Sequence, residues 1–372
     1  MKVEWLEAEN FRNLTQLRLE ADESVNVIHG RNAQGKTNLV ECIWMFTGGR
    51  SFRGAKDSEL IRIGEQGSRM KLGFYAQERS QQAEIRIEEK RSASLNGVSL
   101  KSAAALSENF SAVIFSPVHL DLIKGPPAMR RRFLDAALCG LKPGYAAALS
   151  KYNRALKQRA ALLRDLPYHS ELYDMLDIWD DRLSSFGAAV IHTRLSYIRG
   201  LNGICIPVYR DISGGREKLE LTYECSGGIR DAGREELRDQ LSEALKRLRR
   251  EDMASGTTGA GPHRDDLGIS ISGLAARTYA SQGQQRSAAF ALKLGEAGII
   301  QTMTGEQPVM LLDDVLSELD DARQAYVLNR IEGSQVFITC CDPSGLLRLS
   351  GGTSFHMEGG RIVEKNRRNG GG

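Results

Sequence analysis

The chain has 372 residues, of which 41% are hydrophobic and 26% charged, a globular composition that excludes wholesale disorder, a fibrous repeat and a small disulfide-stapled fold. Its net charge of +3, from 50 basic and 47 acidic residues, is too small to indicate a nucleic-acid-binding protein by itself. The sequence has no apolar run of about 18 residues and no basic, apolar leader, so we expect a cytoplasmic protein of two lobes, away from membranes.

Alternating polar and apolar residues predict strands at the start of the chain, in residues 2–10 and 15–21. A buried-type strand at 24–30 runs into a glycine loop, and a helix is expected from about Lys36 to Phe46. Further alternating segments follow, joined at one point by Asn96 and Gly97, the preferred two-residue hairpin turn. These segments predict an antiparallel meander.

From about Pro117 the hydrophobic period becomes helical, which predicts a second lobe. Long helical segments are expected around residues 130–141, 144–166, 171–202 and 235–250. In the last of these, four leucines share one face: Leu237, Leu241, Leu245 and Leu248. Glycine-rich segments near residue 230 and at 254–262 are expected to be mobile loops.

The first lobe resumes with two buried parallel-type strands, at 307–314 and 334–342. The basic, glycine-terminated tail, 365–372, is expected to fray. The six cysteines are scattered and lack metal-ligand spacing, so they are expected to be reduced and mostly buried thiols.

A glycine-rich loop, GRNAQGKT, matches the phosphate-binding loop and lies between an apolar strand and a helix, where that chemistry requires it. Gly30 and Gly35 let backbone N–H groups curl around phosphate oxygens at the positive end of the helix. Lys36 is expected to reach the β- and γ-phosphates of ATP, and the Thr37 hydroxyl to ligate Mg²⁺. A fortuitous glycine turn is the alternative, and the strand-loop-helix context weighs against it. The predicted nucleotide site comprises Gly30, Arg31, Asn32, Ala33, Gln34, Gly35, Lys36, Thr37 and Asn38.

The apolar strand at 309–314 ends in two acids, as expected of the Mg²⁺ side of such a site. We expect Asp313 to hold the metal and Asp314 to act as general base beside the attacking water. Taken alone, this segment is better explained as a strand capped by solvated acids. The phosphate-binding loop earlier in the chain reverses that preference.

SQGQQR, from Ser281 to Arg286, opens a helical segment upstream of SELD, Ser317 to Asp320. A serine and a glycine at a helix N-terminus form an anion site. Since one complete phosphate loop has little need of a second within the same active site, we expect this motif to cap the γ-phosphate of a partner subunit. An ordinary serine N-cap is the alternative, and SQGQQR alone would favour it.

Together, NFRN (10–13), GRNAQGKT, SQGQQR, LLDDVLSELD and FITCCD resemble, in this order, the ABC-type ATPases of the chromosome-maintenance and DNA-repair branch. Within that branch the chain is most similar to the RecF family, on FSPVHLDLIKG and RRRFLD between Phe115 and Asp135 and on GPHRDD from Gly261 to Asp266. A short helical lobe also stands where chromosome-maintenance relatives carry a long coiled coil. The resemblance spans about residues 1–365 and implies an α/β ATPase head, with a mixed sheet and an antiparallel meander, plus a helical second lobe.

The implied organisation places the ATPase lobe at residues 1–115 and 304–372, and the helical lobe with the signature helix at 116–303. By the resemblance, Arg12 and Asn13 line the nucleotide site, Ser281 and Gly283 act across a dimer, and Asp320 belongs to the loop that joins the two sites. It further implies a homodimer that forms with ATP and clamps duplex DNA at gaps or junctions. The resemblance also implies a role in repair and replication, in which the protein helps to load recombinase and has a RecR-like mediator protein as its partner.

The chain departs from the broad ABC pattern at several positions. Gln282 replaces a signature glycine, Asp314 stands at the catalytic glutamate position, and Thr339 stands in place of the switch histidine. A shorter base without a histidine favours slow hydrolysis, as in a weak ATPase that serves as a switch. The sequence leaves the Q-loop glutamine, the hydrolysis rate, the partner-binding surface and the preferred DNA structure open.

Two basic clusters are candidate contacts to DNA phosphates. The first surrounds a Pro-Pro helix start and consists of Lys124, Arg130, Arg131 and Arg132; an internal salt-bridge network, with acids such as Asp135, is an equally good interpretation. The second consists of Lys246, Arg247, Arg249 and Arg250, where a solvated helix end is the favoured alternative. The roles of His263 and Arg264 are left open. Because aromatics make up only 6% of the chain, contacts mainly to phosphates, weakened by salt, are expected.

Two other classes of protein share the phosphate-binding loop. An ABC subunit of a membrane transporter is expected to have a switch histidine and a full LSGGQ-type signature, and this chain lacks both. A small-molecule kinase needs a lid and an acceptor pocket but no signature helix, so SQGQQR and SELD count against it.

Overall fold

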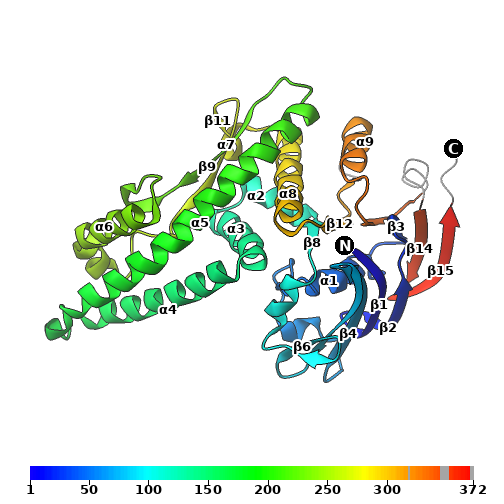
Figure 1. Ribbon diagram of the computed structural model, residues 1–372, viewed down its shortest axis with the longest axis horizontal. Coiled ribbons are helices and arrows are strands. Elements are labelled where there is room, and N and C mark those ends of the chain that lie inside the picture. Colours follow the sequence, from blue (N-terminus) through cyan, green and yellow to red (C-terminus); the bar gives the residue numbers. More distant parts are fainter. Residues whose placement is uncertain (317–318, 344–351, 369–372) are drawn as a thin grey trace. The chain divides into compact units, whose positions relative to one another are not determined.

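The computed structural model describes residues 1–316, 319–343 and 352–368, and the chain divides into two compact units (Figure 1). The head unit is Met1–Leu120 with Arg286–Gly372, and the helical unit is Asp121–Gln285. The boundary at which the chain returns from the helical unit to the head unit therefore lies between Gln285 and Arg286, and not between residues 303 and 304 as expected. The reason is that most of helix α8, Gln282–Thr304, packs in the head unit, where Phe290 stacks on Phe115 with ring centroids 5.1 Å apart.

The N-terminal segments form a six-stranded antiparallel sheet in the order β2-β1-β4-β5-β6-β7. Its strands are β1 Lys2–Phe11, β2 Leu14–Glu20, β4 Ser68–Ala76, β5 Arg79–Ile87, β6 Arg91–Leu95 and β7 Val98–Ser99. Asn96 and Gly97 have φ angles of 49° and 81° and connect β6 to β7 in the predicted hairpin turn. The predicted meander is thus confirmed, because both turn residues tolerate the left-handed backbone.

A second six-stranded sheet has the order β15-β14-β3-β13-β12-β8 and is parallel except between β14 and β15. Its strands are β3 Val25–His29, β8 Ala112–Phe115, β12 Val309–Asp313, β13 Val336–Cys340, β14 Gly352–Glu358 and β15 Arg361–Arg368. The predicted parallel pairing of β12 with β13 is confirmed. The expectation of a frayed tail was wrong for residues 365–368, because the backbone of β15 pairs with β14 there. Residues 369–372 lie outside the described ranges.

Helix α1, Lys36–Met45, contacts strand β1 of the first sheet and strands β12 and β13 of the second. Its side chains Leu39, Val40 and Ile43 are fully buried, and one hydrophobic core joins them to both sheets. Burying each such side chain stabilises the fold by about 1.5–3 kcal/mol. The loop that begins this helix is therefore held by the core of the head unit. Helix α9, Asp321–Arg330, lies between β12 and β13 in the chain.

The helical unit contains the predicted long helices and a small sheet that the hydrophobic pattern did not predict. Its helices are α2 Asp121–Lys124, α3 Pro127–Leu141, α4 Pro143–Asp165, α5 Met175–Ile212, α6 Arg234–Ser255 and α7 Ala276–Tyr279. Its antiparallel strands are β9 Leu219–Glu224, β10 Asp266–Ile271 and β11 Leu274–Ala275, in the order β11-β10-β9. Helix α5 packs along α4 and also contacts α6 (Figure 1). No helix of the described ranges is both long and apolar enough to cross a bilayer.

Short 3₁₀ helices occupy several connections: Asp57–Leu60, Ala103–Glu108, Pro117–Leu120, Ser170–Leu172 and Ser226–Gly228. The connection at 254–262 is packed, which contradicts its expected mobility. Thr258 and Ala260 are buried there, and the Arg159 guanidinium donates a hydrogen bond to the Thr258 hydroxyl at 3.0 Å. The predicted leucine face of α6 is confirmed, since Leu237, Leu241 and Leu245 are buried.

Candidate functional site

The phosphate-binding loop joins β3 to α1 and depends on its two glycines. Gly30 and Gly35 have φ angles of 146° and 104°, which side chains rarely allow. A Cβ atom at Gly30 would lie 2.4 Å from the carbonyl oxygen of Met357, and one at Gly35 would lie 2.7 Å from Oδ1 of Asn13. Both positions therefore require glycine. Between them, Arg31, Asn32 and Ala33 are exposed.

Lys36 is nearly buried, and its ammonium is held within the loop itself. Nζ donates hydrogen bonds to the backbone oxygens of Gly30, at 2.7 Å, and Arg31, at 2.9 Å. These contacts keep the charge at the N-terminus of α1, where the helix dipole also favours an anion. A positive side chain and a positive helix end thus converge on the same loop.

A hydroxyl and a carboxylate meet beside Lys36. Thr37 Oγ1 donates to Asp313 Oδ1 at 2.9 Å, and Thr339 Oγ1 donates to the same oxygen at 2.9 Å. Burial raises the pKa of Asp313, and the hydrogen bonds from Thr339 and Thr37 oppose that rise. An oxygen-only set with one buried carboxylate suits Mg²⁺, so the chemistry of these residues fits the predicted metal.

Thr339 also holds the second acid of the strand. The backbone N–H of Asp314 donates to Thr339 Oγ1 at 2.9 Å, and Asp314 has a left-handed φ of 54°. Such backbone conformations in residues other than glycine cluster at functional sites. The sequence identified Thr339 only as the substitute for a histidine. Its hydrogen bonds to both acids depend on the pairing of β12 with β13, which no local pattern predicts.

Cys341 is the side chain just after β13 that reaches the phosphate-binding loop. Its Sγ donates to Asn32 Oδ1 at 3.3 Å and lies 3.9 Å from Lys36 Nζ. None of the six cysteines forms a disulfide; Cys42, Cys205 and Cys340 are buried, whereas Cys341 is exposed. No motif in the sequence marks Cys341 as a contact of this loop, because the contact arises only when β13 pairs with β3.

The turn between β14 and β15 supports the loop from another side. The backbone N–H groups of Gly359 and Gly360 donate to Gln34, to Oε1 at 2.7 Å and to the backbone oxygen at 3.0 Å. His356 of β14 stacks on His29, which directly precedes the loop, with ring centroids 5.0 Å apart. This hairpin was not among the predicted elements, although a Gly-Gly pair after alternating residues is a hairpin signal.

Arg12 and Asn13 contact α1 at two residues about one turn apart, Glu41 and Asn38. The Arg12 guanidinium donates to both carboxylate oxygens of the fully buried Glu41, at 3.1 and 3.2 Å. Asn13 faces the loop, donating to the backbone oxygen of Ala33 at 3.4 Å and accepting from Asn38 Nδ2 at 2.8 Å. The structure thus brings Asn13 to the loop, while Arg12 anchors α1 through Glu41.

Ser281 and Gly283 lie at the start of α8, within the helical unit. Ser281, which is exposed, and Gln284, which is half-buried, form a capping pair: Ser281 N donates to Gln284 Oε1 at 2.7 Å, and Gln284 N donates to Ser281 Oγ at 3.3 Å. Asp320 caps α9 by accepting from the backbone N–H of Arg323 at 2.9 Å. Ser317 and Glu318 of SELD lie outside the described residues.

One arginine of each predicted DNA cluster is committed to internal ion pairs. Arg130 is buried and donates to both carboxylate oxygens of Asp266, at 2.8 and 2.6 Å. Arg249 pairs with Asp180 at 2.7 Å and with Asp177. Arg131, half-buried, donates to the Asp265 backbone oxygen at 2.9 Å. The internal-network alternative therefore holds for Arg130, with Asp266 as partner in place of Asp135. Exposed members of the two clusters are Lys124, Arg132, Lys246, Arg247 and Arg250.

His263 and Arg264, whose roles the sequence left open, organise the packed segment 254–262. His263 Nδ1 lies 2.6 Å from the Tyr152 hydroxyl oxygen, and its Nε2 lies 3.0 Å from the Thr258 backbone oxygen. Arg264 donates to the same backbone oxygen at 3.1 Å. Burial lowers the pKa of His263 to about 4. These contacts assign His263 a structural role within the helical unit.

This lowered pKa predicts a pH-dependent stability. Between the ordinary histidine pKa, near 6.5, and about 4, the unfolded chain binds a proton that the folded chain does not. The free energy of unfolding should therefore fall as pH drops through this window, by up to about 3 kcal/mol from His263. Urea titrations between pH 7 and 4 should show a weaker pH dependence in His263→Gln and an unchanged one in His169→Gln, an exposed control. An equal dependence in His263→Gln and wild type would contradict this assignment.

Sequence comparison relates the chain to a family of DNA-repair and chromosome-maintenance ATPases. The family model described as the RecF/RecN/SMC N terminal domain matches residues 2–349. The "DNA replication and repair protein RecF" of Agathobacter rectalis is 40% identical over 342 residues, which cover 91% of this chain and 92% of that protein. The protein of the same name from Thermoanaerobacter pseudethanolicus is 40% identical over 368 residues, covering 98% of this chain and 100% of the relative.

Solved structures show the same relationship. The structure described as "the recombination mediator protein RecF-ATP in RecFOR pathway" has a TM-score of 0.90 and 38% identity, covering 98% of this chain and 97% of that chain. A head domain of Smc derived from Pyrococcus furiosus has a TM-score of 0.55 and 16% identity, covering 98% of this chain and 96% of that one. The second similarity shows the fold alone. The expected ABC-type head with mixed and antiparallel sheets is confirmed.

Proposed function

Because the chain belongs to the RecF family of DNA replication and repair proteins, we propose that it binds ATP through the loop Gly30–Thr37 and uses the nucleotide to control binding to duplex DNA. The observation that carries this proposal is the convergence of Lys36, Thr37 and Asp313 at the start of α1. The relatives solved with ATP support it, since the chain matches them along 98% of its length.

Each residue of the site has a proposed task. Backbone N–H groups of the loop and the Lys36 ammonium bind the phosphates. Thr37 and Asp313 would hold Mg²⁺, and the bound ion would neutralise negative charge on the phosphates. Asp314 accepts a proton from the attacking water, and Thr339 keeps the two acids in place. An aspartate as general base, with Thr339 in place of the switch histidine, favours slow hydrolysis. Slow hydrolysis suits a weak, DNA-dependent ATPase that acts as a switch.

We propose that two copies of the chain close around two ATP molecules. The exposed Ser281, with Gly283, begins the long helix α8 and presents a helix N-terminus able to cap an anion. The γ-phosphate held by one copy would be capped by this motif of the other. Loss of that phosphate on hydrolysis would remove the contact, separate the subunits and release DNA.

DNA contacts are proposed for the exposed cations of the two predicted clusters, namely Lys124, Arg132, Lys246, Arg247 and Arg250. Such contacts would be mainly to phosphates and would weaken with salt. Action at gaps or junctions, assistance to recombinase loading, a RecR-like partner and a cytoplasmic location remain parts of this proposal. A transporter subunit or a small-molecule kinase is not favoured, because the matched relatives are named as replication and repair proteins.

The dimer proposal predicts the effect of Ser281→Arg. An arginine at this helix start would fill the position of the capped γ-phosphate and place a positive charge against the helix dipole. Wild type should change from monomer to dimer with ATP, Mg²⁺ and a short duplex, as measured by sedimentation or light scattering, whereas Ser281→Arg should stay monomeric while still binding ATP. Ser92→Arg, which adds the same charge at an exposed position of β6, should dimerise like wild type. A wild type that binds ATP and stays monomeric with DNA would contradict the clamp.

A further inference from the structure

Helix α4 carries a surface that neither predicted DNA cluster includes. Residues 136–164 contain no aspartate or glutamate, although the whole chain is nearly balanced at 50 basic and 47 acidic residues. The same segment contains six basic residues: Lys142, Lys151, Arg154, Lys157, Arg159 and Arg164. Apart from Asp165 at its C-terminal end, α4 therefore carries only basic charged side chains, and one of these, Arg159, pairs with acids of other elements.

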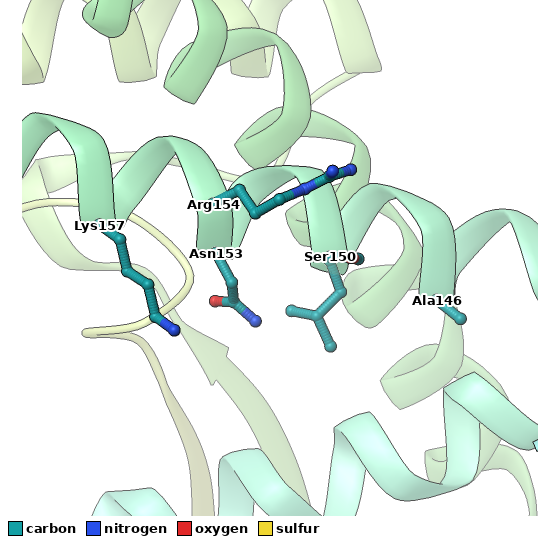
Figure 2. A pocket seen from close by; sticks show the side chains of 6 residues that line it. Ala146, Ser150, Asn153, Arg154 and Lys157 are labelled. Carbon is teal, nitrogen blue, oxygen red and sulfur yellow. The ribbon is translucent and has the colours of Figure 1, made fainter.

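Lys151, Arg154 and Lys157 are exposed and follow one another at intervals of three along α4, so they form one stripe on its surface, the α4 stripe. Figure 2 shows a shallow groove along the helix, where Lys157 and Asn153 project to the same side and Arg154 runs along the helix. The lining is completed by Ala146, Leu149 and Ser150. Ser150 and Asn153 thus accompany Arg154 and Lys157 in the groove, and among the described residues no aromatic side chain lines it.

The α4 stripe differs from those cations of the helical unit that pair with acids. Arg159, on the same helix, is fully buried and pairs with Asp180 at 2.7 Å and Asp252 at 2.6 Å. Within the described ranges, no member of the stripe forms an ion pair with an acid; Lys151 lies over the Phe186 ring, 5.7 Å from its centroid. Among the exposed arginines elsewhere in the unit, Arg199, Arg210 and Arg238 pair with acids, at 2.8, 3.8 and 2.7 Å.

We propose that the α4 stripe binds the phosphate backbone of duplex DNA. Like charges at this spacing repel one another, and an anionic ligand removes that repulsion. The stripe extends over about 9 Å of helix, and duplex DNA carries one charge per about 1.7 Å of its axis, so several phosphates lie within its reach. Ser150 and Asn153 supply neutral hydrogen-bond donors beside the cations, a combination typical of phosphate contacts. An acidic protein partner is less well matched, because protein interfaces centre on buried aromatic and apolar anchors.

This inference rests on the proposed function, since it assigns a surface to the proposed DNA binding. The test compares three proteins by titrating duplex DNA binding over a range of salt concentrations. They are wild type, the stripe variant Lys151→Gln/Arg154→Gln/Lys157→Gln, and the control Arg199→Gln/Arg210→Gln/Arg238→Gln, which removes the same net charge from positions already paired with acids. ATP binding and unfolding are measured for each, so that a failure to fold is recognised.

The stripe variant should bind DNA about tenfold more weakly or worse at low salt, and its slope of log K against log salt should fall by about 0.9 for each phosphate that the stripe no longer neutralises. The control should keep the wild-type slope. The charge-conserving variant Lys151→Arg/Arg154→Lys/Lys157→Arg should also keep it. Acetylation of Lys151 and Lys157 should be slowed by DNA, whereas the exposed Lys90 of the head unit should react equally with and without DNA.

A stripe variant with the wild-type slope would overturn the inference, as would equal weakening of DNA binding in the stripe variant and the control. Normal DNA binding combined with a failure to bind a protein partner would also overturn it and assign the stripe to that partner. A wild type that binds ATP but no DNA would instead overturn the proposed function. The two failures are therefore distinguishable.

Discussion

Lys36→Ala is expected to weaken ATP binding at least about a hundredfold. The Lys36 ammonium lies inside the phosphate-binding loop, held by the backbone oxygens of Gly30 and Arg31 at 2.7 and 2.9 Å. Replacing it removes charge-assisted hydrogen bonds to phosphates, each worth about 1.5–3 kcal/mol, and tenfold in affinity corresponds to about 1.4 kcal/mol. Titration calorimetry with ATP and Mg²⁺ measures the loss directly.

Two variants make this result specific. Lys90→Ala removes an exposed lysine of the same unit and should leave ATP affinity within about twofold of wild type, since it lies away from the loop in sequence and is solvated. Lys36→Arg keeps the positive charge but replaces a compact ammonium with a larger, planar guanidinium, so this variant should bind ATP less well than wild type. If Lys36→Ala bound ATP with an affinity within threefold of wild type, the loop would not be the ATP site. The proposed ATP-dependent dimer would then need a different nucleotide site.

Arg159→Met is expected to lower the free energy of unfolding by about 3–5 kcal/mol. Arg159 is fully buried and donates to Asp180 and Asp252, themselves 1% and 2% exposed. A methionine keeps the apolar stem of the side chain but leaves the buried carboxylates without their cation. In this variant Asp180 would still pair with Arg249, at 2.7 Å. Asp252 would lose its cation and would keep a hydrogen bond from the Gly259 backbone N–H, at 2.9 Å.

Urea unfolding followed by circular dichroism measures this loss. Arg164→Met, an exposed arginine of the same helix, is the matched control and should change stability by no more than about 0.5 kcal/mol. A decrease below about 1 kcal/mol in Arg159→Met would show that the network contributes little and that Asp252 accepts a proton or another partner when the cation is removed.

Local patterns were sufficient for most of the secondary structure and for the phosphate-binding loop. Alternation of polar and apolar residues predicted β1, β2 and the meander, because one face of each strand packs on the core and the other meets solvent. GRNAQGKT was recognisable because its glycines are needed for backbone geometry within a single turn, as the φ angles of Gly30 and Gly35 confirm. The strand that carries Asp313 was identified by its apolar run and its acidic end.

The sequence by itself thus determined the class of fold, the loop and the order of its motifs, since each depends on residues close together in the chain. The partners of charged and hydroxyl groups were decided only by the tertiary structure. Arg130 belongs to the internal core because Asp266, 136 positions later, reaches it, and Thr339 holds Asp313 because β12 and β13 pair in register. The same holds for the hairpin of β14 and β15, whose turn supports Gln34. Whether such a group is buried, and which group it pairs with, depends on packing between residues far apart in the chain. The sequence therefore does not distinguish a buried arginine from an exposed one.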